Sequence, residues 1–317
     1  MFIYLSTFFI ALSVTLLTTP LIQKLAVHIG AVDEPNERKI HATAVPRLGG
    51  VAIYLGFAAA LLISLIFAGV LGRGLEMKHM TGILLSSLLM LALGVMDDLR
   101  GLSAWTKLIC QIAIATVVVF FGIEITFMSN PFNGLFILGA IAAPLTVLWL
   151  VGMTNAINLI DGLDGLAAGV TAISAGTLFF VALRTHQIGA ALTLLALCGA
   201  ALGFLRYNFF PAKIFLGDSG SYLLGFILAA ASVTGVFKTT LVVALIIPIL
   251  ILGVPIFDTM FAIGRRISSG QSPFKADNRH IHHLLLRAGF TQREAVLAIY
   301  VACFMLSISA LIMALQR

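Results

Sequence analysis

Apolar segments long enough to cross a lipid bilayer follow one another along nearly the whole chain. A helix needs roughly 20 apolar residues to cross a hydrocarbon core of about 30 Å, and several of these segments approach that length. With 60% hydrophobic and only 10% charged residues, the chain could not hide its apolar surface in a water-soluble fold. The sequence therefore predicts an all-α, polytopic integral membrane protein.

About ten transmembrane helices are predicted from hydropathy and from the polar breaks between apolar segments. They cover residues 2–27, 49–70, 80–96, 105–121, 134–151, 165–183, 188–205, 219–236, 239–262 and 294–314. The first segment has no basic n-region and runs into another span, so we expect an uncleaved anchor rather than a signal peptide. Because no internal repeat is found, residues 1–317 are predicted to form a single integral membrane domain.

The positions of Lys and Arg predict the orientation of these helices. Only five of the 19 basic residues fall on the side of the two termini: Arg73, Lys78, Arg184, Lys238 and Arg317. The other side is therefore predicted to be cytoplasmic, and both termini extracytoplasmic. The net charge of +6 is explained by topology and phosphate affinity, and gives no reason to expect nucleic acid as a partner.

Acidic residues gather on the same predicted cytoplasmic side, where all but Glu76 and Glu124 of the 13 Asp and Glu residues lie. Acidic residues contribute little to orientation, so this clustering indicates a functional use of negative charge. Asp97 and Asp98 end an apolar segment side by side. Adjacent carboxylates repel each other unless a cation lies between them, which favours metal or proton chemistry over an ordinary helix end.

One segment carries a polar side chain at every third position: Asn155, Asn158, Asp161 and Asp164. Residues at this spacing drift about 60° per step around an ideal α-helix, so all four converge only if the helix tightens or breaks. Gly162 and Gly165 permit such a break and would let phosphates or a ribose approach the backbone closely.

Asp218 opens the eighth predicted span in the segment Gly217-Asp218-Ser219-Gly220-Ser221. It could cap that helix, or it could bind a hard cation beside a helix N-terminus that favours phosphate; the sequence leaves both interpretations open. Asp258, by contrast, lies within a predicted span. We expect it to be a structural partner of a neighbouring helix or basic residue rather than a catalytic group.

Three histidines, His280, His282 and His283, lie in the last predicted cytoplasmic loop among Arg and Lys residues. No cysteine is near, and the available carboxylates are oxygen donors suited to magnesium rather than zinc. A phosphate-binding role fits a basic loop better, although an inert cluster of loop histidines stays open.

Together these motifs resemble those of the polyprenyl-phosphate N-acetylhexosamine-1-phosphate transferases, which belong to glycosyltransferase family 4. The matching segments occur in family order: residues 33–41 with 46–50, 97–98, 155–165, 208 with 215–221, and 279–283. The order His280-Ile281-His282-His283-Leu284 is similar to the branch that transfers GlcNAc 1-phosphate to undecaprenyl phosphate. The muramyl-pentapeptide branch instead has three consecutive histidines followed by Phe-Glu.

The resemblance implies a role for each matching position. The implied catalytic residues are Asp97, Asp98, Asp161 and His282. The implied metal ligands are Asp218 and Asp98, binding Mg²⁺ with Mn²⁺ as a substitute. The implied substrate-binding residues are Lys39, Lys107, Asn158, Asp164, Asn208, Phe215, Arg279, His280 and His283.

The resemblance also implies the reaction: GlcNAc 1-phosphate passes from UDP-GlcNAc to undecaprenyl phosphate, giving undecaprenyl-diphosphate-GlcNAc and UMP. This step would initiate a cell-envelope glycopolymer, such as teichoic acid or O-antigen, at the cytoplasmic face of a bacterial inner membrane. Another donor, such as UDP-MurNAc-pentapeptide, stays open, as do a two-step covalent mechanism and a homodimer. A secondary transporter is the alternative from another class, but its ionisable groups would lie nearer the bilayer midplane.

Overall fold

The computed structural model describes residues 2–33, 44–70, 77–129, 135–235, 246–270 and 280–315. Its α-helices are α1 (Phe2–His28), α2 (Gly49–Val70), α3 (Met77–Arg100), α4 (Ala104–Phe120), α5 (Ala142–Ile160), α6 (Leu166–Arg184), α7 (Ile188–Asn208), α8 (Gly217–Gly235), α9 (Ile246–Ile251), α10 (Gly253–Ser268), α11 (Ile281–Arg287) and α12 (Gln292–Leu315). A 3₁₀-helix, η1 (Gly139–Ile141), precedes α5. The strands are β1 (Val32–Asp33), β2 (Val45–Pro46), β3 (Phe127–Ser129) and β4 (Leu135–Ile137).

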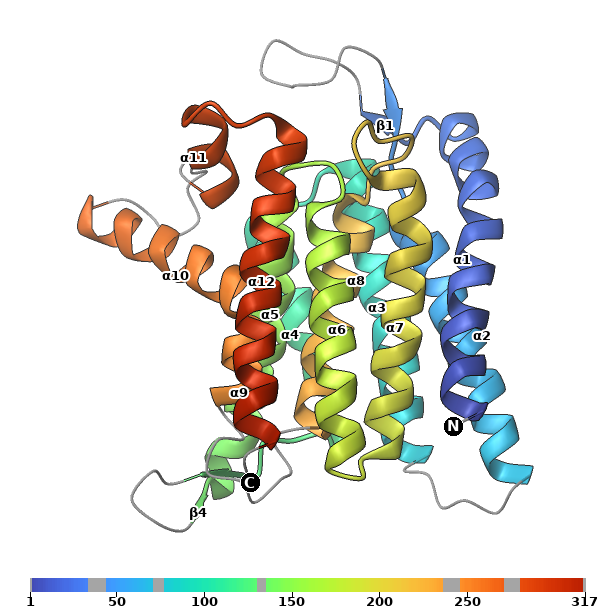
Figure 1. The fold of residues 1–317 in the computed structure, drawn as a ribbon, viewed down its shortest axis with the longest axis vertical. Helices are drawn as coiled ribbons and strands as arrows, with labels where there is room; N and C mark the ends of the chain where they lie inside the picture. Colours follow the sequence, from blue (N-terminus) through green and yellow to red (C-terminus); the bar gives the residue numbers. More distant parts are fainter. Residues whose placement is uncertain are drawn as a thin grey trace.

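The long helices form a bundle in which both termini lie at one end, as Figure 1 shows. The β1–β2 hairpin and α11 lie at the opposite end, whereas the β3–β4 hairpin is on the side of the termini. Both hairpins are antiparallel, and Val32 pairs with Pro46 in the first. A chain that crosses the membrane an even number of times has both termini on the same side, in agreement with this arrangement of the termini.

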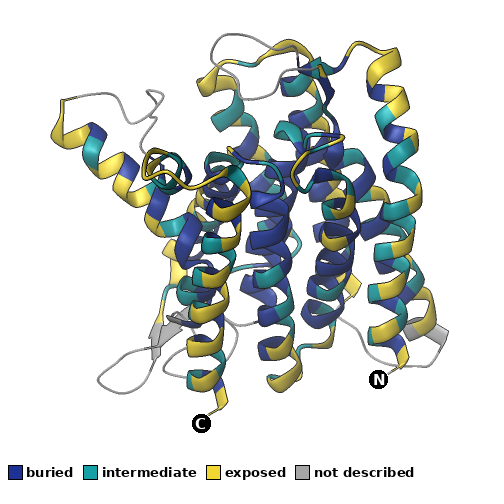
Figure 2. Ribbon diagram, turned by 45° about the horizontal axis from the view of Figure 1, so that its top comes forward, coloured by how far each residue is buried: buried dark blue, intermediate teal, exposed yellow. Residues whose placement is uncertain are grey.

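The centre of the bundle is α8, which packs against α2, α3, α5, α6 and α7. Every residue from Ser219 to Gly235 is buried, and Figure 2 shows the buried residues concentrated in the inner helices. Small residues make this packing possible: a Cβ at Gly225 would meet the backbone of α5, and one at Gly94 would meet Ser219. Close backbone approach at small residues is the usual way in which helices associate inside a bilayer.

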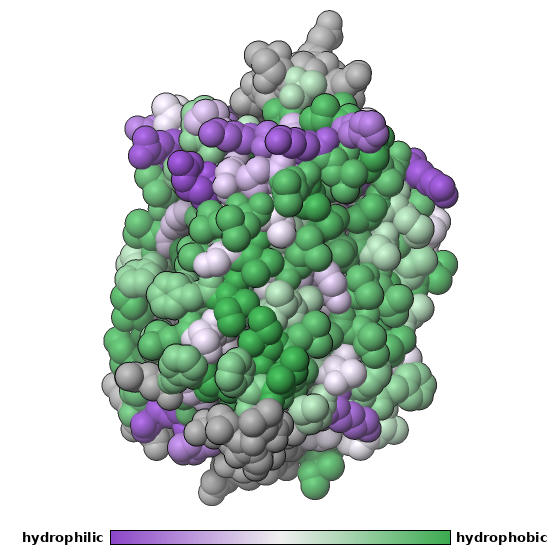
Figure 3. All heavy atoms as spheres, turned by 90° about the vertical axis from the view of Figure 1, so that its right-hand side faces the viewer, coloured by the Kyte–Doolittle hydropathy of each residue, from purple (hydrophilic) through white to green (hydrophobic). Residues whose placement is uncertain are grey.

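The outer surface is apolar, in agreement with the predicted membrane location. Large exposed side chains such as Leu17 and Leu21 on α1, and Phe304 and Met305 on α12, would be unfavourable in water. Figure 3 shows the apolar surface bounded by polar residues towards both ends of the bundle. The chain is therefore a polytopic, all-helical membrane protein.

Among the described residues, seven helices are long and apolar enough to cross a membrane: α1, α2, α3, α5 with η1, α6, α7 and α12. The predicted number of about ten is thus not confirmed. Of the remaining three predicted spans, α4 is a shorter apolar helix of 17 residues, and α8 is enclosed by its neighbours.

The predicted span 239–262 is interrupted in the described part of the chain. Helix α9 ends at Ile251, and α10 begins at Gly253 and projects away from the bundle (Figure 1). Gly253 and Pro255 lie at this junction, where glycine disfavours a continuous helix and proline removes a hydrogen-bond donor. Hydropathy alone did not resolve this break.

The β1–β2 hairpin is tied to the loop that precedes α8. The Phe215 N–H donates to the Pro46 carbonyl at 2.8 Å, and the Gly49 N–H donates to the Phe215 carbonyl at 3.1 Å. At the start of α2, a Cβ on Gly50 would collide with the Ser219 backbone. These contacts fix the hairpin beside the N-terminus of α8, at the end of the bundle that holds the polar motifs.

Candidate active site

A cavity of about 560 Å³ opens at the end of the bundle that carries the β1–β2 hairpin. It lies where α3 and α5 end, where α8 begins and where the β1–β2 hairpin folds over them. Its described lining includes the polar or charged residues Asp33, Arg47, Asp98, Asn158, Asp161, Asp164, Asn208, Asp218, His283 and Gln292. Segments that are far apart in the sequence therefore contribute to one site, as the clustering of acidic residues predicted.

Asp98 caps the N-terminus of α8. Its two carboxylate oxygens accept hydrogen bonds from the backbone N–H groups of Asp218 (2.8 Å) and Ser219 (3.0 Å). Gly217 adopts a positive φ of 72°, and a Cβ there would meet the Asp98 carboxylate at 2.6 Å, so glycine is required on both grounds. A carboxylate at a helix N-terminus also interacts favourably with the helix dipole. This contact joins the end of α3 to the start of α8.

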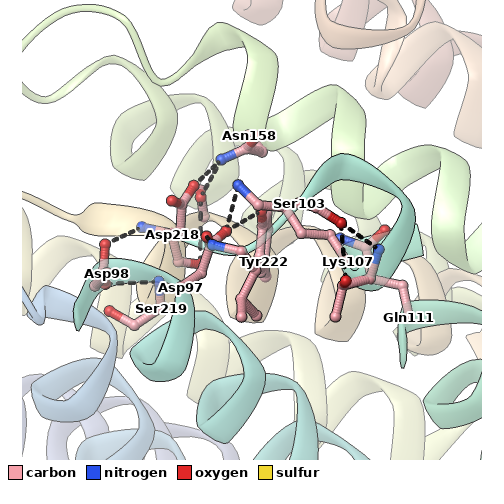
Figure 4. A network of polar contacts seen from close by, with 12 residues as sticks. Asp97, Asp98, Ser103, Lys107, Gln111, Asn158, Asp218, Ser219 and Tyr222 are labelled. Atoms are coloured by element: carbon pink, nitrogen blue, oxygen red, sulfur yellow. Dashed lines mark hydrogen bonds and ion pairs between the residues drawn. The ribbon is translucent and has the colours of Figure 1, made fainter. Parts of the chain in front are cut away.

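Asp97 points to the other side of α3 and is only 4% exposed. Its Oδ2 accepts a hydrogen bond from the Tyr222 hydroxyl (2.8 Å) and pairs with Lys107 Nζ at 2.6 Å. Its Oδ1 accepts the Leu102 N–H at 2.8 Å. Figure 4 shows these side chains meeting between α3, α4 and α8. The Asp97 carboxylate is thus surrounded by donors, and it is not part of the cavity lining.

The helix break predicted at Gly162 and Gly165 is present, because α5 ends at Ile160 and Gly165 adopts a left-handed conformation with φ of 80°. As a result Asn158, Asp161 and Asp164 all line the cavity. Asn158 donates to Asp218 Oδ1 (2.7 Å) and to Ser221 Oγ (2.9 Å), as Figure 4 shows for Asp218.

Asn155 does not join them. Its Nδ2 donates to the Gln111 Oε1 on α4 at 2.7 Å and to the Val151 carbonyl at 2.8 Å. The first member of the three-residue repeat therefore connects α5 with α4, and only the later members reach the cavity. Each three-residue step rotates the side chain by about 60° around an ideal helix, so Asn155 is expected to point away from the residues that follow the helix break.

The negative charge in the cavity acts on Asp161. Burial, and then the carboxylates of Asp218, Asp98 and Asp164, raise the pKa of Asp161 well above its ordinary value. A bound cation would relieve this repulsion. The cavity therefore has the electrostatic character of a cation site.

The donor set fits magnesium. Within the described residues, no three His, Cys, Asp or Glu side chains form a ready-made metal cage. Mg²⁺ does not need one, since it commonly binds through one or two carboxylates together with waters and substrate phosphates. Asp218 and Asp98 face the cavity, and an ionised carboxylate has about four lone-pair sites, so the hydrogen bonds they already accept leave room for a cation.

Asn208 and Asp164 hold the loops that shape the cavity. Asn208 is 3% exposed; its Oδ1 accepts the Gly165 N–H (3.1 Å), and its Nδ2 donates to the Ile214 carbonyl (3.0 Å). Asp164 Oδ2 accepts the Ala212 N–H at 2.9 Å. The turn after α5 is thereby attached to the loop before α8, where Phe215 lines the cavity.

The histidine segment is anchored by Asp258. Asp258 Oδ2 lies 2.7 Å from His280 Nδ1, and its Oδ1 accepts the Ile281 N–H at 2.8 Å. Both side chains are buried. Asp258 therefore has the neighbouring basic partner that the sequence predicted, and it connects α10 with the start of α11; that it has no catalytic role stays a prediction.

The three histidines differ in their surroundings. His283 lines the cavity, whereas His282 is buried and packs against Gly162, where any Cβ would collide with the imidazole. Burial, followed by the neighbouring His283 and His280, lowers the pKa of His282 to about 4. His282 is thus neutral at physiological pH and supports the turn after α5.

The predicted site residues fall into three groups. Those that line the cavity are Asp98, Asn158, Asp161, Asp164, Asn208, Phe215, Asp218 and His283. Those that adjoin it are Asp97, Lys107, His280 and His282. Lys39 and Arg279 lie outside the described residues. The catalytic, metal-binding and substrate-binding roles assigned to these residues stay predictions.

Sequence reasoning did not single out Asp33, Arg47 or Tyr222 as site residues. Asp33 and Arg47 belong to the first segment of the family resemblance, but only the antiparallel hairpin brings them together. The sequence could have indicated Tyr222 as a site residue, because it follows Asp218 by four residues and therefore lies on the same face of α8.

Comparison with known proteins assigns a family to this arrangement. Residues 80–236 match the model of glycosyl transferase family 4. The "Probable undecaprenyl-phosphate N-acetylglucosaminyl 1-phosphate transferase" of Bacillus subtilis is 44% identical over 308 aligned residues, covering 96% of this chain and 84% of that protein. The decaprenyl-phosphate N-acetylglucosaminephosphotransferase of Mycolicibacterium smegmatis is 38% identical, covering 90% of this chain and 76% of that protein. The undecaprenyl-phosphate alpha-N-acetylglucosaminyl 1-phosphate transferase of Yersinia pestis is 30% identical, covering 92% and 79% respectively.

Proposed function

The chain belongs to glycosyl transferase family 4, and from this premise we propose that it transfers GlcNAc 1-phosphate from UDP-GlcNAc to undecaprenyl phosphate. The products are undecaprenyl-diphosphate-GlcNAc and UMP. The relatives whose names specify this type of reaction align with nearly the whole chain, so the proposal covers the entire protein.

The observation that carries the proposal is the convergence of carboxylates at the ends of three helices on one cavity at the end of a membrane bundle. Asp98, Asp161 and Asp218 all line it. A soluble nucleotide sugar can enter such a cavity from the water, while an acceptor with a long isoprenoid tail stays in the bilayer. A site at the helix ends is therefore the place where both substrates can meet.

In the proposed reaction, an oxygen of the lipid phosphate attacks the phosphorus that carries the sugar. A new P–O bond forms as the bond to the bridging oxygen breaks, and UMP leaves with that oxygen. A phosphomonoester has a second pKa near 6, so the lipid phosphate is already largely deprotonated at neutral pH. A strong general base is therefore not required, which is consistent with an Asp97 that is enclosed by Tyr222, Lys107 and the Leu102 N–H.

Both substrates are anions, so the first task of the protein is to compensate their charge. Mg²⁺, when bound, would neutralise the diphosphate and the charge that builds on the leaving UMP. The carboxylates of Asp218 and Asp98 are the proposed ligands. Lys107 supplies a positive charge beside Asp97, at the edge of the bundle where α3 meets α4. Positioning and electrostatics can account for most of the rate in such reactions.

We place the cavity on the cytoplasmic side of a bacterial inner membrane. Most Lys and Arg residues belong to loops of the predicted cytoplasmic side, which is where the cavity-forming segments lie. The donor nucleotide is also made available in the cytosol. In this position the enzyme would begin the assembly of a cell-envelope glycopolymer on its lipid carrier.

The proposal is tested with the purified full-length protein in detergent, supplied with UDP-[¹⁴C]GlcNAc, undecaprenyl phosphate and Mg²⁺. Transfer of label into the lipid fraction, with release of UMP, is the expected result. Addition of EDTA should stop the reaction, and excess Mg²⁺ or Mn²⁺ should restore it. A lack of lipid-linked product, combined with solute uptake by proteoliposomes, would favour a transporter instead. Label transfer only from UDP-MurNAc-pentapeptide would correct the donor.

A further inference from the structure

Among the residues that the structure describes, the charges that line the cavity are strongly unbalanced. Five carboxylates face it: Asp33, Asp98, Asp161, Asp164 and Asp218. Among the described lining residues, Arg47 is the only Lys or Arg. The proposed donor carries a diphosphate, which would be repelled by such a lining unless cations compensate it. The position of Arg47 therefore bears directly on how an anionic nucleotide enters.

Arg47 is held in place by the β1–β2 hairpin. Its guanidinium pairs with the Asp33 carboxylate, and its backbone N–H donates to the Ala31 carbonyl at 2.9 Å. The neighbouring Pro46 carbonyl accepts the Phe215 N–H, which fixes the hairpin to the loop before α8. Arg47 thus belongs to a preorganised structure rather than to a freely moving surface.

The two partners of this ion pair differ in exposure. The Asp33 side chain is 9% exposed, while that of Arg47 is 32% exposed. A guanidinium has five N–H donors, and a single carboxylate engages at most part of this set. The remaining donors of Arg47 are available to the cavity, where its charge also acts on Asp98.

Lys107 occupies the opposite side of the carboxylate pair on α3. It is bound to Asp97 and is not among the residues that line the cavity. The two cations have different partners: Arg47 lines the cavity and pairs with Asp33, whereas Lys107 pairs with Asp97 outside the lining, and its charge also acts on Asp218. Two substrates, each with its own phosphate, match these two positions.

We infer that Arg47 binds the diphosphate of the nucleotide sugar and that Asp33 is a positioning residue that aims its guanidinium into the cavity. This inference rests on the proposed function for the identity of the nucleotide. The lipid phosphate, which has the same chemistry, belongs on the side of Lys107. Arg47 is then a determinant of donor affinity, and it remains available to hold the UMP product until release.

A purely structural role for Arg47 makes a different prediction. In that case Arg47 would only neutralise the buried Asp33 and stabilise the hairpin. Removal of both charges in Asp33→Asn/Arg47→Gln would then restore the behaviour of the wild type, because neither member of the ion pair would keep its charge after losing the opposite one. If Arg47 binds phosphate, the double variant stays as defective as Arg47→Gln. The pair of variants therefore separates the two roles.

The experiment measures binding of UDP and of uridine to the purified full-length protein with Mg²⁺ by isothermal titration calorimetry. For Arg47→Gln we expect the Kd for UDP to rise by about tenfold to a hundredfold, since one charge-assisted contact is lost, while the Kd for uridine stays unchanged. Arg47→Lys, which keeps the charge but not the fork of donors, should fall between wild type and Arg47→Gln. In the transfer assay, the KM for UDP-GlcNAc should rise, and the KM for undecaprenyl phosphate should not.

Each contrary outcome overturns the inference. Unchanged UDP affinity in Arg47→Gln would remove Arg47 from the donor site, and recovery in the double variant would assign it a structural role. A rise in the KM for the lipid acceptor alone would place the lipid phosphate at Arg47. An equal loss of UDP and uridine binding would also contradict the inference, because loss of a phosphate contact should weaken the binding of UDP and leave that of uridine unchanged. Wild-type protein that binds UDP but transfers no sugar would defeat the proposed function alone, because the binding comparison between variants would still stand.

Discussion

Asp97 and Asp98 are neighbours in the sequence, yet their side chains lie in two regions that differ in how the protein compensates negative charge. The closed region consists of Asp97, Lys107 and Tyr222, in which the carboxylate is buried and its charge is compensated by the protein. The open region consists of Asp98, Asp161, Asp164 and Asp218, which face a common cavity. Successive residues of an α-helix point about 100° apart, which is sufficient to send the two side chains into different surroundings.

The difference shows how a membrane protein can concentrate negative charge without losing stability. In the closed region, the Lys107 ammonium, the Tyr222 hydroxyl and a backbone N–H all contact the Asp97 carboxylate. In the open region, helix α8 supplies N–H donors to Asp98, but burial, followed by repulsion from the neighbouring carboxylates, raises the pKa of Asp161. The closed region is complete by itself, whereas the open region is completed by a cation and substrate.

The sharpest test of this contrast is Asp218→Asn in the open region. The variant keeps the size of the side chain but removes a charge that we propose to bind Mg²⁺, so activity should fall by about a thousandfold or more at ordinary Mg²⁺ concentrations. The initial rate of label transfer to lipid is the measurement. Glu124→Gln, which changes a carboxylate outside the cavity lining, is the control and should retain activity. Full activity of Asp218→Asn would remove this residue as a metal ligand.

Asp97→Asn in the closed region should be less damaging. The amide has one acceptor oxygen in place of two, so it keeps the hydrogen bond from either the Tyr222 hydroxyl or the Leu102 N–H, and Lys107 loses its counter-charge. We expect about 1% of wild-type activity to remain, with the larger effect on the KM for undecaprenyl phosphate. Steady-state kinetics with each substrate varied in turn measures this effect. If Asp97→Asn were as inactive as Asp218→Asn, the distinction between the two regions would not hold for catalysis.

Tyr222→Phe probes the closed region more gently. Loss of one hydrogen bond to a buried carboxylate should reduce activity by about tenfold, because Lys107 and the Leu102 N–H still hold Asp97. Tyr207→Phe is the matched control, since the Tyr207 hydroxyl donates to the Leu16 carbonyl, on a helix remote from the cluster. Equal effects of the two substitutions would show that Tyr222 acts only through general stability.

The last expected effect concerns stability rather than activity, and its pH dependence at the edge of the open region. His282 has a pKa of about 4 in the folded protein, below its ordinary value of 6.5, so the unfolded chain binds its proton first as the pH falls. The free energy of unfolding should therefore decrease by about 2 kcal/mol between pH 7 and pH 5 on account of this residue.

Thermal unfolding in detergent at the two pH values provides the measurement for His282. The His282→Asn variant should lose less stability on acidification than the wild type, even if it is less stable at pH 7. His28→Asn, at an exposed position, should behave as the wild type does. An unchanged pH dependence in His282→Asn would contradict the assignment of a buried, neutral imidazole.

Much of this architecture follows directly from sequence patterns. Apolar length predicted most of the helices, and the glycines at 162 and 165 predicted the break that brings Asn158, Asp161 and Asp164 into the cavity. These features depend on local chemistry, which a sequence displays. The three-residue spacing of amides and carboxylates from Asn155 to Asp164, and the Gly217-Asp218 segment at the start of α8, are also local features that the sequence displays.

Other features depend on which side of a helix faces which neighbour. Nothing in the adjacent pair Asp97-Asp98 tells which carboxylate enters the cavity, because that depends on the packing of α3 against α4 and α8. The partners of Asp33 and Asn208 are likewise set by tertiary contacts. The interruption between α9 and α10 was missed because both halves are apolar enough to be read as one span.

The two chain ends lie at the end of the bundle opposite the cavity (Figure 1). Affinity tags or reporter domains joined to either end would therefore stay clear of the nucleotide entrance, and neither would sterically compete with a soluble substrate. The same separation makes each terminus an indirect indicator of sidedness: a reporter that matures only in an oxidising compartment and is active at the C-terminus would place the cavity in the cytosol.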